Sequence, residues 1–194
     1  NGYETSIAFH LPSAILPLTS VLVIDPQLWW ATFYGGNGLD GPMSITNDAS
    51  GNVFVTGYTD SPNFPVQNAG TFFQGTFGGA GDAFILKFDN AVNRLWATYY
   101  GGNGTENQFT YHNLAIDACG NVYMSFHTFS TALPFQAPCD GGYFDNTFNG
   151  PRDVFLVLFS NTGALLWSTY IGGDGNDFRE ALTIDPNNNL FMAG

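Results

Sequence analysis

The sequence predicts an all-β fold made of repeated four-stranded antiparallel units. Three observations predict it: blocks of sequence that recur in a fixed order, apolar alternation typical of strands, and a lack of helical patterning. The chain has 194 residues, of which 44% are hydrophobic and 16% aromatic, and it contains 24 glycines. This composition excludes a disordered chain. No segment carries an apolar stripe at a spacing of 3.6 residues with helix caps, so we expect little helix.

Three recurring blocks define the repeat. The first begins at a tryptophan and ends in a glycine-rich corner, at Trp30–Gly38, Trp96–Gly104 and Trp167–Gly175. The second begins at an aspartate that precedes alternating apolar residues, at Asp48–Gly57, Asp117–Phe126 and Asp185–Gly194. The third is an aspartate followed by an apolar run, at Asp82–Phe88 and Asp153–Phe159. The tryptophans are 66 and 71 residues apart, which indicates an internal structural repeat.

Each repeat contains four expected strands, which we call a, b, c and d in chain order. In the first repeat they are near Ser44–Asn47, at Asn52–Thr59, at Ala83–Asp89 and at Arg94–Tyr100. Strand b alternates its side chains with a period of two, as a pleated strand does. Strand c is a nearly continuous apolar run, which is typical of a strand covered on both faces.

A tight turn is expected between strands a and b. The side chain of Asp48 can accept a hydrogen bond from the backbone two residues on. Gly51 and Gly120 can adopt a positive φ without a Cβ clash. Asn188 holds the equivalent position in the third copy, and asparagine tolerates that conformation better than most residues.

A four-stranded antiparallel unit that recurs at this spacing is typical of a β-propeller blade. The usual blade has about 40–50 residues, so each repeat here has an excess. The extra residues lie between strands b and c, at Asp60–Gly81 and Phe129–Arg152. Loops of this length are either functional or pack along neighbouring blades.

The blocks resemble a known family. The Trp-Ala-Thr-Tyr-x-Gly-Gly corner, the Asp-x-x-Gly-Asn turn, Ser61–Pro65 and Asp82–Phe88 are similar to the bacterial β-propeller repeat called SBBP. The resemblance covers roughly Leu28 to Gly194 and departs from the family at Phe126-His127 and Leu133-Pro134. It implies a secreted or cell-surface bacterial protein, often exported by type IX secretion and in some members linked to adhesion.

The repeat boundaries predict the domain organisation. Residues 1–20 form a lead-in, and residues 21–194 form the propeller region. That region divides into a half blade at 21–40, whole blades at 41–106 and 107–177, and a half blade at 178–194. The first half blade contains strands c and d at Val21–Ile24 and Trp29–Tyr34, and the last contains strands a and b. We therefore expect the chain to be a segment of a longer propeller.

The glycine-rich corners between strands d and a supply the candidate binding residues. Each corner ends in an acid, at Asp40, Glu106 and Asp177. Together with Asn37, Asn103 and Asp174 these oxygens are weak candidates for calcium, which prefers six or more oxygen ligands. The alternative is that the glycines make the turn while the acid binds backbone amides. We expect a binding face that contains the three acids together with Trp29 and Phe64.

Other candidate sites remain open at this point. Cys119 and Cys139 could form a disulfide, remain as free buried thiols or, with His112 and His127, bind a metal, although the spacing matches no compact ligand pair. Asp82 and Asp153 recur before strand c and could form a catalytic pair, but recurrence in every repeat favours a structural role. The recurring tryptophans Trp30, Trp96 and Trp167 are expected to pack between blades.

Charge limits the partners. The chain has 16 acidic and four basic residues, for a net charge of −12, so we exclude nucleic acid and an anionic membrane surface. No apolar stretch is long enough for a membrane helix. The predicted function is a non-catalytic extracellular scaffold that binds a protein, a glycan or the remaining blades of a longer protein, with no cofactor. The alternatives are a carbohydrate-active enzyme with a carboxylate pair and a calcium-stabilised repeat array.

Overall fold

The computed structural model describes residues 28–68, 72–106, 112–177 and 181–194. The chain forms two units, residues 1–33 and residues 34–194. The second unit contains all ten strands found in the described part of the chain, and no helix occurs there. The all-β prediction is therefore confirmed.

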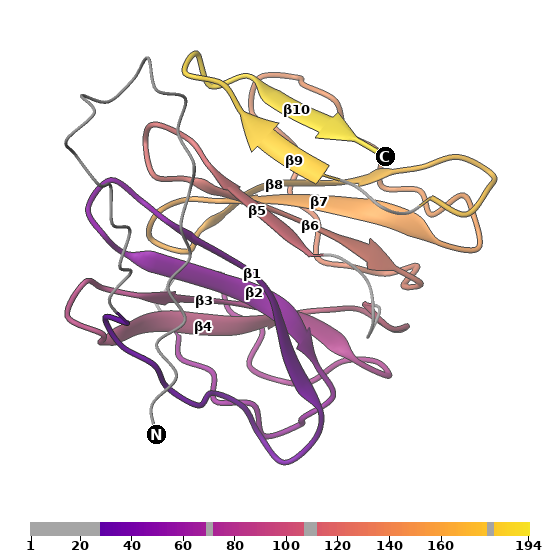
Figure 1. Ribbon diagram of the computed structural model, residues 1–194. Coiled ribbons are helices and arrows are strands. Elements are labelled where there is room, and N and C mark those ends of the chain that lie inside the picture. Colours follow the sequence, from indigo (N-terminus) through magenta and orange to yellow (C-terminus); the bar gives the residue numbers. More distant parts are fainter. Residues whose placement is uncertain (1–27, 69–71, 107–111, 178–180) are drawn as a thin grey trace, which may run out of the picture. The chain divides into compact units, whose positions relative to one another are not determined.

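Two four-stranded sheets and one two-stranded sheet make up the second unit (Figure 1). The strands of the first sheet are β1 (Asp40–Asn47), β2 (Val53–Thr59), β3 (Asp82–Phe88) and β4 (Arg94–Tyr100). Those of the second sheet are β5 (Asn113–Ile116), β6 (Val122–Thr128), β7 (Asp153–Phe159) and β8 (Leu165–Ile171). The third sheet pairs β9 (Ala181–Ile184) with β10 (Leu190–Ala193).

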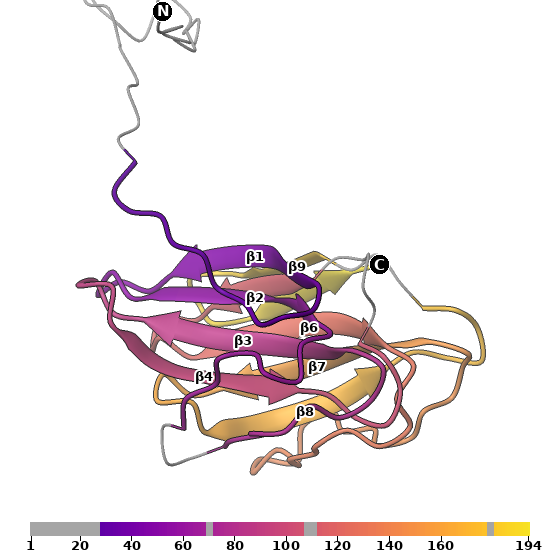
Figure 2. The ribbon, with the colours of Figure 1, turned by 90° about the horizontal axis from the view of Figure 1, so that it is seen from below.

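Each whole sheet is an antiparallel meander in chain order, as Figure 2 shows for β1 to β4. The first strands of the sheets, β1, β5 and β9, contact one another in series. Neighbouring sheets therefore meet at their first strands, which is the arrangement of propeller blades. Strand β4 has the predicted bounds, and β3 is buried at every residue, as its apolar run predicted.

The predicted turns form in all three repeats. Asp48 Oδ1 accepts hydrogen bonds from the amides of Ser50 and Asn52, both at 2.9 Å. The aspartates Asp117 and Asp185 make the same contacts in their repeats. The residues expected at positive φ have it, namely Gly51 at 79°, Gly120 at 80° and Asn188 at 65°.

Aromatic side chains fill the space between the two whole sheets. The Tyr100 ring lies 5.9 Å from the rings of Phe126 and Phe155 and 5.8 Å from that of Phe159. Trp96 is 4% exposed and lies 6.1 Å from Phe159. The prediction that this tryptophan packs between blades is confirmed.

The long loops between strands b and c turn back along the outer strand of their own sheet. In the first sheet, Gln67 and Ala97 exchange backbone hydrogen bonds of 2.8 and 3.0 Å. In the second, the Ser168 amide donates to the Gln136 carbonyl and the Tyr170 amide to the Asp145 carbonyl. An exposed strand edge invites pairing with other chains. Part of each long loop therefore covers the outer edge of its own blade, which accounts for some of its extra length.

The first half blade differs from its prediction. The structure assigns no strand to residues 28–34, where Trp29–Tyr34 was expected to form strand d. Val21–Ile24 and the lead-in lie outside the described residues. A strand needs a hydrogen-bonded neighbour, and the described chain supplies no strand a or b for this half blade. In the part of the chain that is described, no helix is long and apolar enough to cross a membrane.

Candidate functional site

The acids that end the glycine-rich corners accept hydrogen bonds from the backbone of the same corners. One oxygen of Asp40 accepts from the Gly36 amide at 2.7 Å, and the other accepts from the Thr59 hydroxyl at 2.5 Å. Asp177 accepts from the Gly173 amide at 2.9 Å. Backbone amides and hydroxyls thus take up carboxylate oxygens that a bound cation would need. These contacts favour the structural alternative for the corners.

Glu106 occupies the corner between the two whole sheets. It is fully buried and accepts hydrogen bonds from the hydroxyls of Thr128 and Ser130 and from the Gly102 amide. Burial raises the pKa of Glu106 to about 7, because the charged form loses its water. The two hydroxyl contacts act in the opposite direction, and nearby Asp82 raises the pKa further.

Asp82 and Glu106 form a carboxylate pair around one glycine. A Cβ on Gly101 would lie 2.2 Å from Asp82 Oδ1 and 2.7 Å from Glu106 Oε2. The same arrangement recurs in the next repeat, where Gly172 lies between Asp153 and Asp177. Glycine is required at both corners, because any side chain would collide with the acids.

The recurring aspartates also hold their own loops. Asp82 Oδ2 accepts from the Gly78 amide at 2.9 Å, and Asp153 Oδ2 from the Asn149 amide at 3.0 Å. Both carboxylates are fully buried, and burial raises both pKa values. A glycosidase pair must reach a sugar from an accessible cleft. The burial and repetition of these pairs therefore favour a structural role for Asp82 and Asp153.

The predicted binding face is only partly assembled. Phe64 is 3% exposed and packs against Phe84 with ring centroids 4.5 Å apart, so its assignment to a binding surface was wrong. The physical reason is that Ser61–Pro65 turns under the sheet, where Tyr99 Oη donates to the Ser61 carbonyl and accepts from the Phe64 amide. Trp29 is exposed, as expected, but belongs to the other unit.

The asparagines predicted as cation ligands bridge the corner to the following loop. The Asn37 amide donates to Asn63 Oδ1 at 2.9 Å, and Asn103 Oδ1 accepts from the Thr131 amide at 3.0 Å. Asp174 is exposed. Among the described residues, no group of three or more His, Cys, Asp or Glu side chains is placed to hold a metal ion. Calcium binding stays a prediction.

The cysteines are free and exposed. The free-thiol alternative is therefore correct, but the expected burial is wrong, because Cys119 lies in a surface turn and Cys139 in a surface loop. The two histidines of the same repeat are both buried. His112 Nε2 lies 3.3 Å from the Glu106 carbonyl oxygen, and its ring packs against Phe126. Both histidine side chains therefore lie in the packed interior of the second sheet's repeat.

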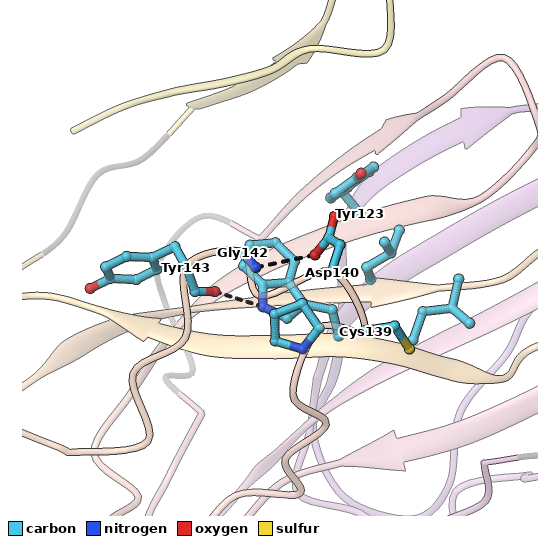
Figure 3. Close-up of a pocket in the computed structure, with 9 residues that line it drawn as sticks. Tyr123, Cys139, Asp140, Gly142 and Tyr143 are labelled. Carbon is cyan, nitrogen blue, oxygen red and sulfur yellow. Dashed lines mark hydrogen bonds between the residues drawn. The ribbon is translucent and has the colours of Figure 1, made fainter.

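A pocket of about 490 Å³ opens on the outer part of the second sheet (Figure 3). Its floor comes from the sheet and includes Tyr123, Leu158 and Trp167, and its wall comes from the loop that contains Cys139 and Tyr143. The Trp167 indole N–H donates to the Tyr143 carbonyl at 2.9 Å. The lining is mainly apolar and aromatic, which suits an apolar occupant. The sequence analysis did not identify this pocket, because its wall is a loop without a repeated motif.

Exposed aromatic side chains gather on the two long loops. Phe73 is 37% exposed on the first loop. Phe129, Tyr143 and Phe144 are 40%, 61% and 38% exposed on the second. Aromatic residues are enriched in protein interfaces, where they contribute large contact areas. The sequence analysis missed these residues, although the aromatic content of the two loops could have indicated them.

The chain is similar to a distantly related WD repeat-containing protein. The chain is 22% identical over 204 aligned positions to an uncharacterized WD repeat-containing protein of Acanthamoeba polyphaga mimivirus. The match covers 88% of this chain but only 13% of the relative. No family model matches the chain. The similarity supports the coarse assignment to propeller-like repeats.

Proposed function

We propose that this chain is a non-catalytic, propeller-type repeat module that binds a protein partner through its two long loops. The observation that carries the proposal is the exposure of Phe73 and Phe129 on loops whose other parts are fixed to the sheets. Loops anchored in this way lose little conformational entropy on binding. The distant similarity to a WD repeat-containing protein supports a scaffold.

The buried carboxylates support the non-catalytic part of the proposal. Asp82, Glu106 and Asp153 are each fully buried and are all engaged by their own loops. Glu106 binds Thr128 and Ser130 at the start of the second long loop, and Asp82 and Asp153 bind the ends of the two loops. Their role is therefore to fix the loops to the sheets. The low-charge surface and the resemblance to SBBP repeats extend the proposal to a secreted or cell-surface bacterial protein involved in adhesion, with glycans as further partners.

Arrays of extracellular proteins and of glycans test this proposal. The wild-type chain should bind at least one arrayed protein saturably. The double variant Phe73→Ser, Phe129→Ser should bind that protein at least about tenfold more weakly, because interface aromatics contribute about 2 kcal/mol or more each. Ile45→Ser is the matched control, since Ile45 is 68% exposed on β1 and away from the long loops. Equal binding by the double variant and wild type, or no protein bound at all, would refute the proposal.

A further inference from the structure

The third sheet has an open edge at β10, which holds the repeat position of a strand b. Among the described residues β10 pairs with β9 alone, whereas β2 also pairs along its length with β3. Phe191 on β10 is 54% exposed, whereas its equivalent Phe54 is fully buried. Strands c and d of the first sheet cover Phe54, since Lys87 Nζ lies 4.8 Å from its ring centroid and the Trp96 ring lies 6.1 Å away. The edge of β10 therefore has room for a further strand.

A cavity of about 270 Å³ lies beside that edge, and its lining includes Ile171 of β8 and Met192 of β10. The equivalents of these two residues between the whole sheets are Tyr100 and Met124, which belong to the buried core. Phe155 of strand c belongs to the same core, and its ring centroid lies 5.9 Å from that of Tyr100. An aromatic side chain on a strand added to β10 would therefore enter the cavity.

The floor of the pocket at Trp167 has the positions that a c–d turn covers in the first sheet. Three floor residues have counterparts there in the strand register, and the pairs are Tyr123 and Phe54, Leu158 and Lys87, and Trp167 and Trp96. The turn between β7 and β8 lies over these counterparts. Lys87 Nζ donates to the Asn161 carbonyl at 3.0 Å, and a Cβ on Gly163 would lie 3.3 Å from the Trp96 indole. The pocket at Trp167 is therefore the place of an equivalent turn.

The loop wall of the pocket has a counterpart in the first repeat as well. Gln74 and Asp145 hold equivalent loop positions, because each backbone amide donates to the hydroxyl of the strand-d threonine. Tyr143 is therefore the equivalent of Phe72. The Phe72 amide donates to the Gly163 carbonyl of the covering turn at 3.3 Å, and Tyr143 is 61% exposed. The Tyr143 amide is thus the group expected to bind a turn that enters the pocket.

We propose that β10 and the pocket at Trp167 together bind a β-hairpin with the c–d sequence of this repeat. The first strand of the hairpin adds to β10, its aromatic residue enters the cavity at Met192, and its turn lies on Trp167. Strand addition supplies backbone hydrogen bonds, and pockets for alternate side chains supply selectivity. The interface between the two whole sheets already contains such a hairpin, β7–β8, which identifies the occupant.

Leu158 determines which turn the site prefers. Its counterpart Lys87 donates to the carbonyl oxygen and to the side-chain oxygen of Asn161, and a leucine has no donor for either. An asparagine at this place in a bound turn would lose water without gaining a partner. The site should therefore prefer a hairpin whose turn has a less polar residue there. Neither Phe73 nor Phe129 belongs to this site, so this proposal and the proposed function can fail separately.

Protection of Cys139 measures occupancy of the site. The probe is a synthetic peptide with the sequence of residues 153–171, flanked by lysines for solubility. Cys139 lines the pocket (Figure 3), whereas Cys119 lies in a surface turn, and both thiols are free and exposed. Saturating peptide should slow the alkylation of Cys139 by iodoacetamide at least severalfold and leave that of Cys119 unchanged. Mass spectrometry of the cysteine-containing fragments gives both rates, and the peptide itself contains no cysteine.

Peptide variants test how the hairpin binds. A Phe155→Ser peptide should protect Cys139 at least about tenfold more weakly, because it cannot fill the cavity at Met192. A Thr162→Ser peptide, changed at an exposed turn residue, is the matched control and should protect as well as the original. No protection, equal protection by the Phe155→Ser peptide, or protection of both cysteines would overturn the proposal. Protection without peptide that grows with protein concentration would identify a second copy of the chain as the occupant and would also overturn it.

An exchange of preference locates the turn on Leu158. The wild-type chain should bind an Asn161→Ala peptide at least as tightly as the original peptide. The chain variant Leu158→Lys should instead favour the original peptide by at least about tenfold, because a lysine can donate to the asparagine as Lys87 does. Protection of Cys139 again measures both affinities. The same preference in the two chains would mean that the turn does not lie over residue 158, and the proposed binding mode would be wrong.

Discussion

Trp96 and Trp167 occupy the same position in the two whole sheets but have different surroundings. Trp96 is 4% exposed and is covered by Phe159 and Gly163 of the next sheet. Trp167 lines an open pocket. Both sheets have the same strand order and the same bulge in their last pairing. The repeated sequence therefore determines the strand order within each sheet. Whether an equivalent residue is buried depends on the sheet that packs against it.

The corner acids show the same contrast. Glu106, between two whole sheets, is fully buried and accepts hydrogen bonds from Thr128 and Ser130 of the second sheet and its loop. Asp177 follows the second sheet and remains partly exposed. A carboxylate that is in contact with water in one repeat is thus enclosed in another. The electrostatic environment of a corner acid therefore depends, as packing does, on the sheet that follows it.

The largest expected effect comes from removing the covered tryptophan. Trp96→Ala should lower the free energy of unfolding by about 3–5 kcal/mol, because it leaves a cavity between two sheets. Trp167→Ala should cost only about 1–2 kcal/mol, because this side chain lines an open pocket and is less completely buried. Urea unfolding followed by circular dichroism measures both. Equal losses for the two variants would contradict the contrast between the two faces.

A smaller effect concerns the pH dependence of stability. The folded-state pKa of Glu106, about 7, lies above the ordinary value of 4.5. The folded protein therefore keeps a proton that the unfolded chain releases between these pH values. The free energy of unfolding should fall as pH rises from 4.5 to 7, by about 3 kcal/mol in total, and then level off.

Glu106→Gln isolates that contribution. The variant should be more stable than wild type at pH 8 and nearly equal to it at pH 4.5, so its pH profile is shallower. A residual slope of the same sign is expected, because the pKa values of Asp82 and Asp153 are also raised by burial. Thr76→Ser, an exposed substitution that adds and removes no titrating group, is the control and should leave the profile unchanged. A Glu106→Gln profile as steep as that of wild type would rule out this assignment.

Local patterns predicted the strands well and the long loops poorly. Strand β4 has the expected bounds, and β2 begins one residue later than expected. Strand β1 begins at Asp40 and not near Ser44, because the corner acid already pairs with Thr59. Strand periodicity depends on neighbours along the chain, so short segments reveal it.

The candidate site depended on contacts that no local pattern encodes. The sequence places the acids at the corners. The burial of Phe64, however, depends on the hydrogen bond from its amide to the Tyr99 hydroxyl, 35 residues away in the sequence. The course of the long loops depends on pairing between Gln67 and Ala97. The pocket at Trp167 is open because, among the described residues, the third sheet has two strands and no turn that covers the indole. Each of these features is a relation between repeats, which a single repeat does not contain.

The smallest expected effect concerns one of four turns that share the same hydrogen-bond pattern. The turn at Asp89–Asn93 has the same aspartate contacts as those at Asp48, Asp117 and Asp185. Where the other three have glycine or asparagine, this turn has Val92, with φ of 68°. A β-branched residue is strained in the left-handed region, at about 1–2 kcal/mol, and asparagine is tolerated there.

Val92→Asn should therefore raise the free energy of unfolding by about 1 kcal/mol, measured by urea unfolding. Little burial is lost, since Val92 is 36% exposed. Ala91→Asn, one residue earlier, is the control and should stay within about 0.5 kcal/mol of wild type, as surface substitutions usually do. A destabilised Val92→Asn would mean that the valine side chain contributes more through packing than its backbone loses through strain. The aspartate contacts alone would then account for the shape shared by these turns.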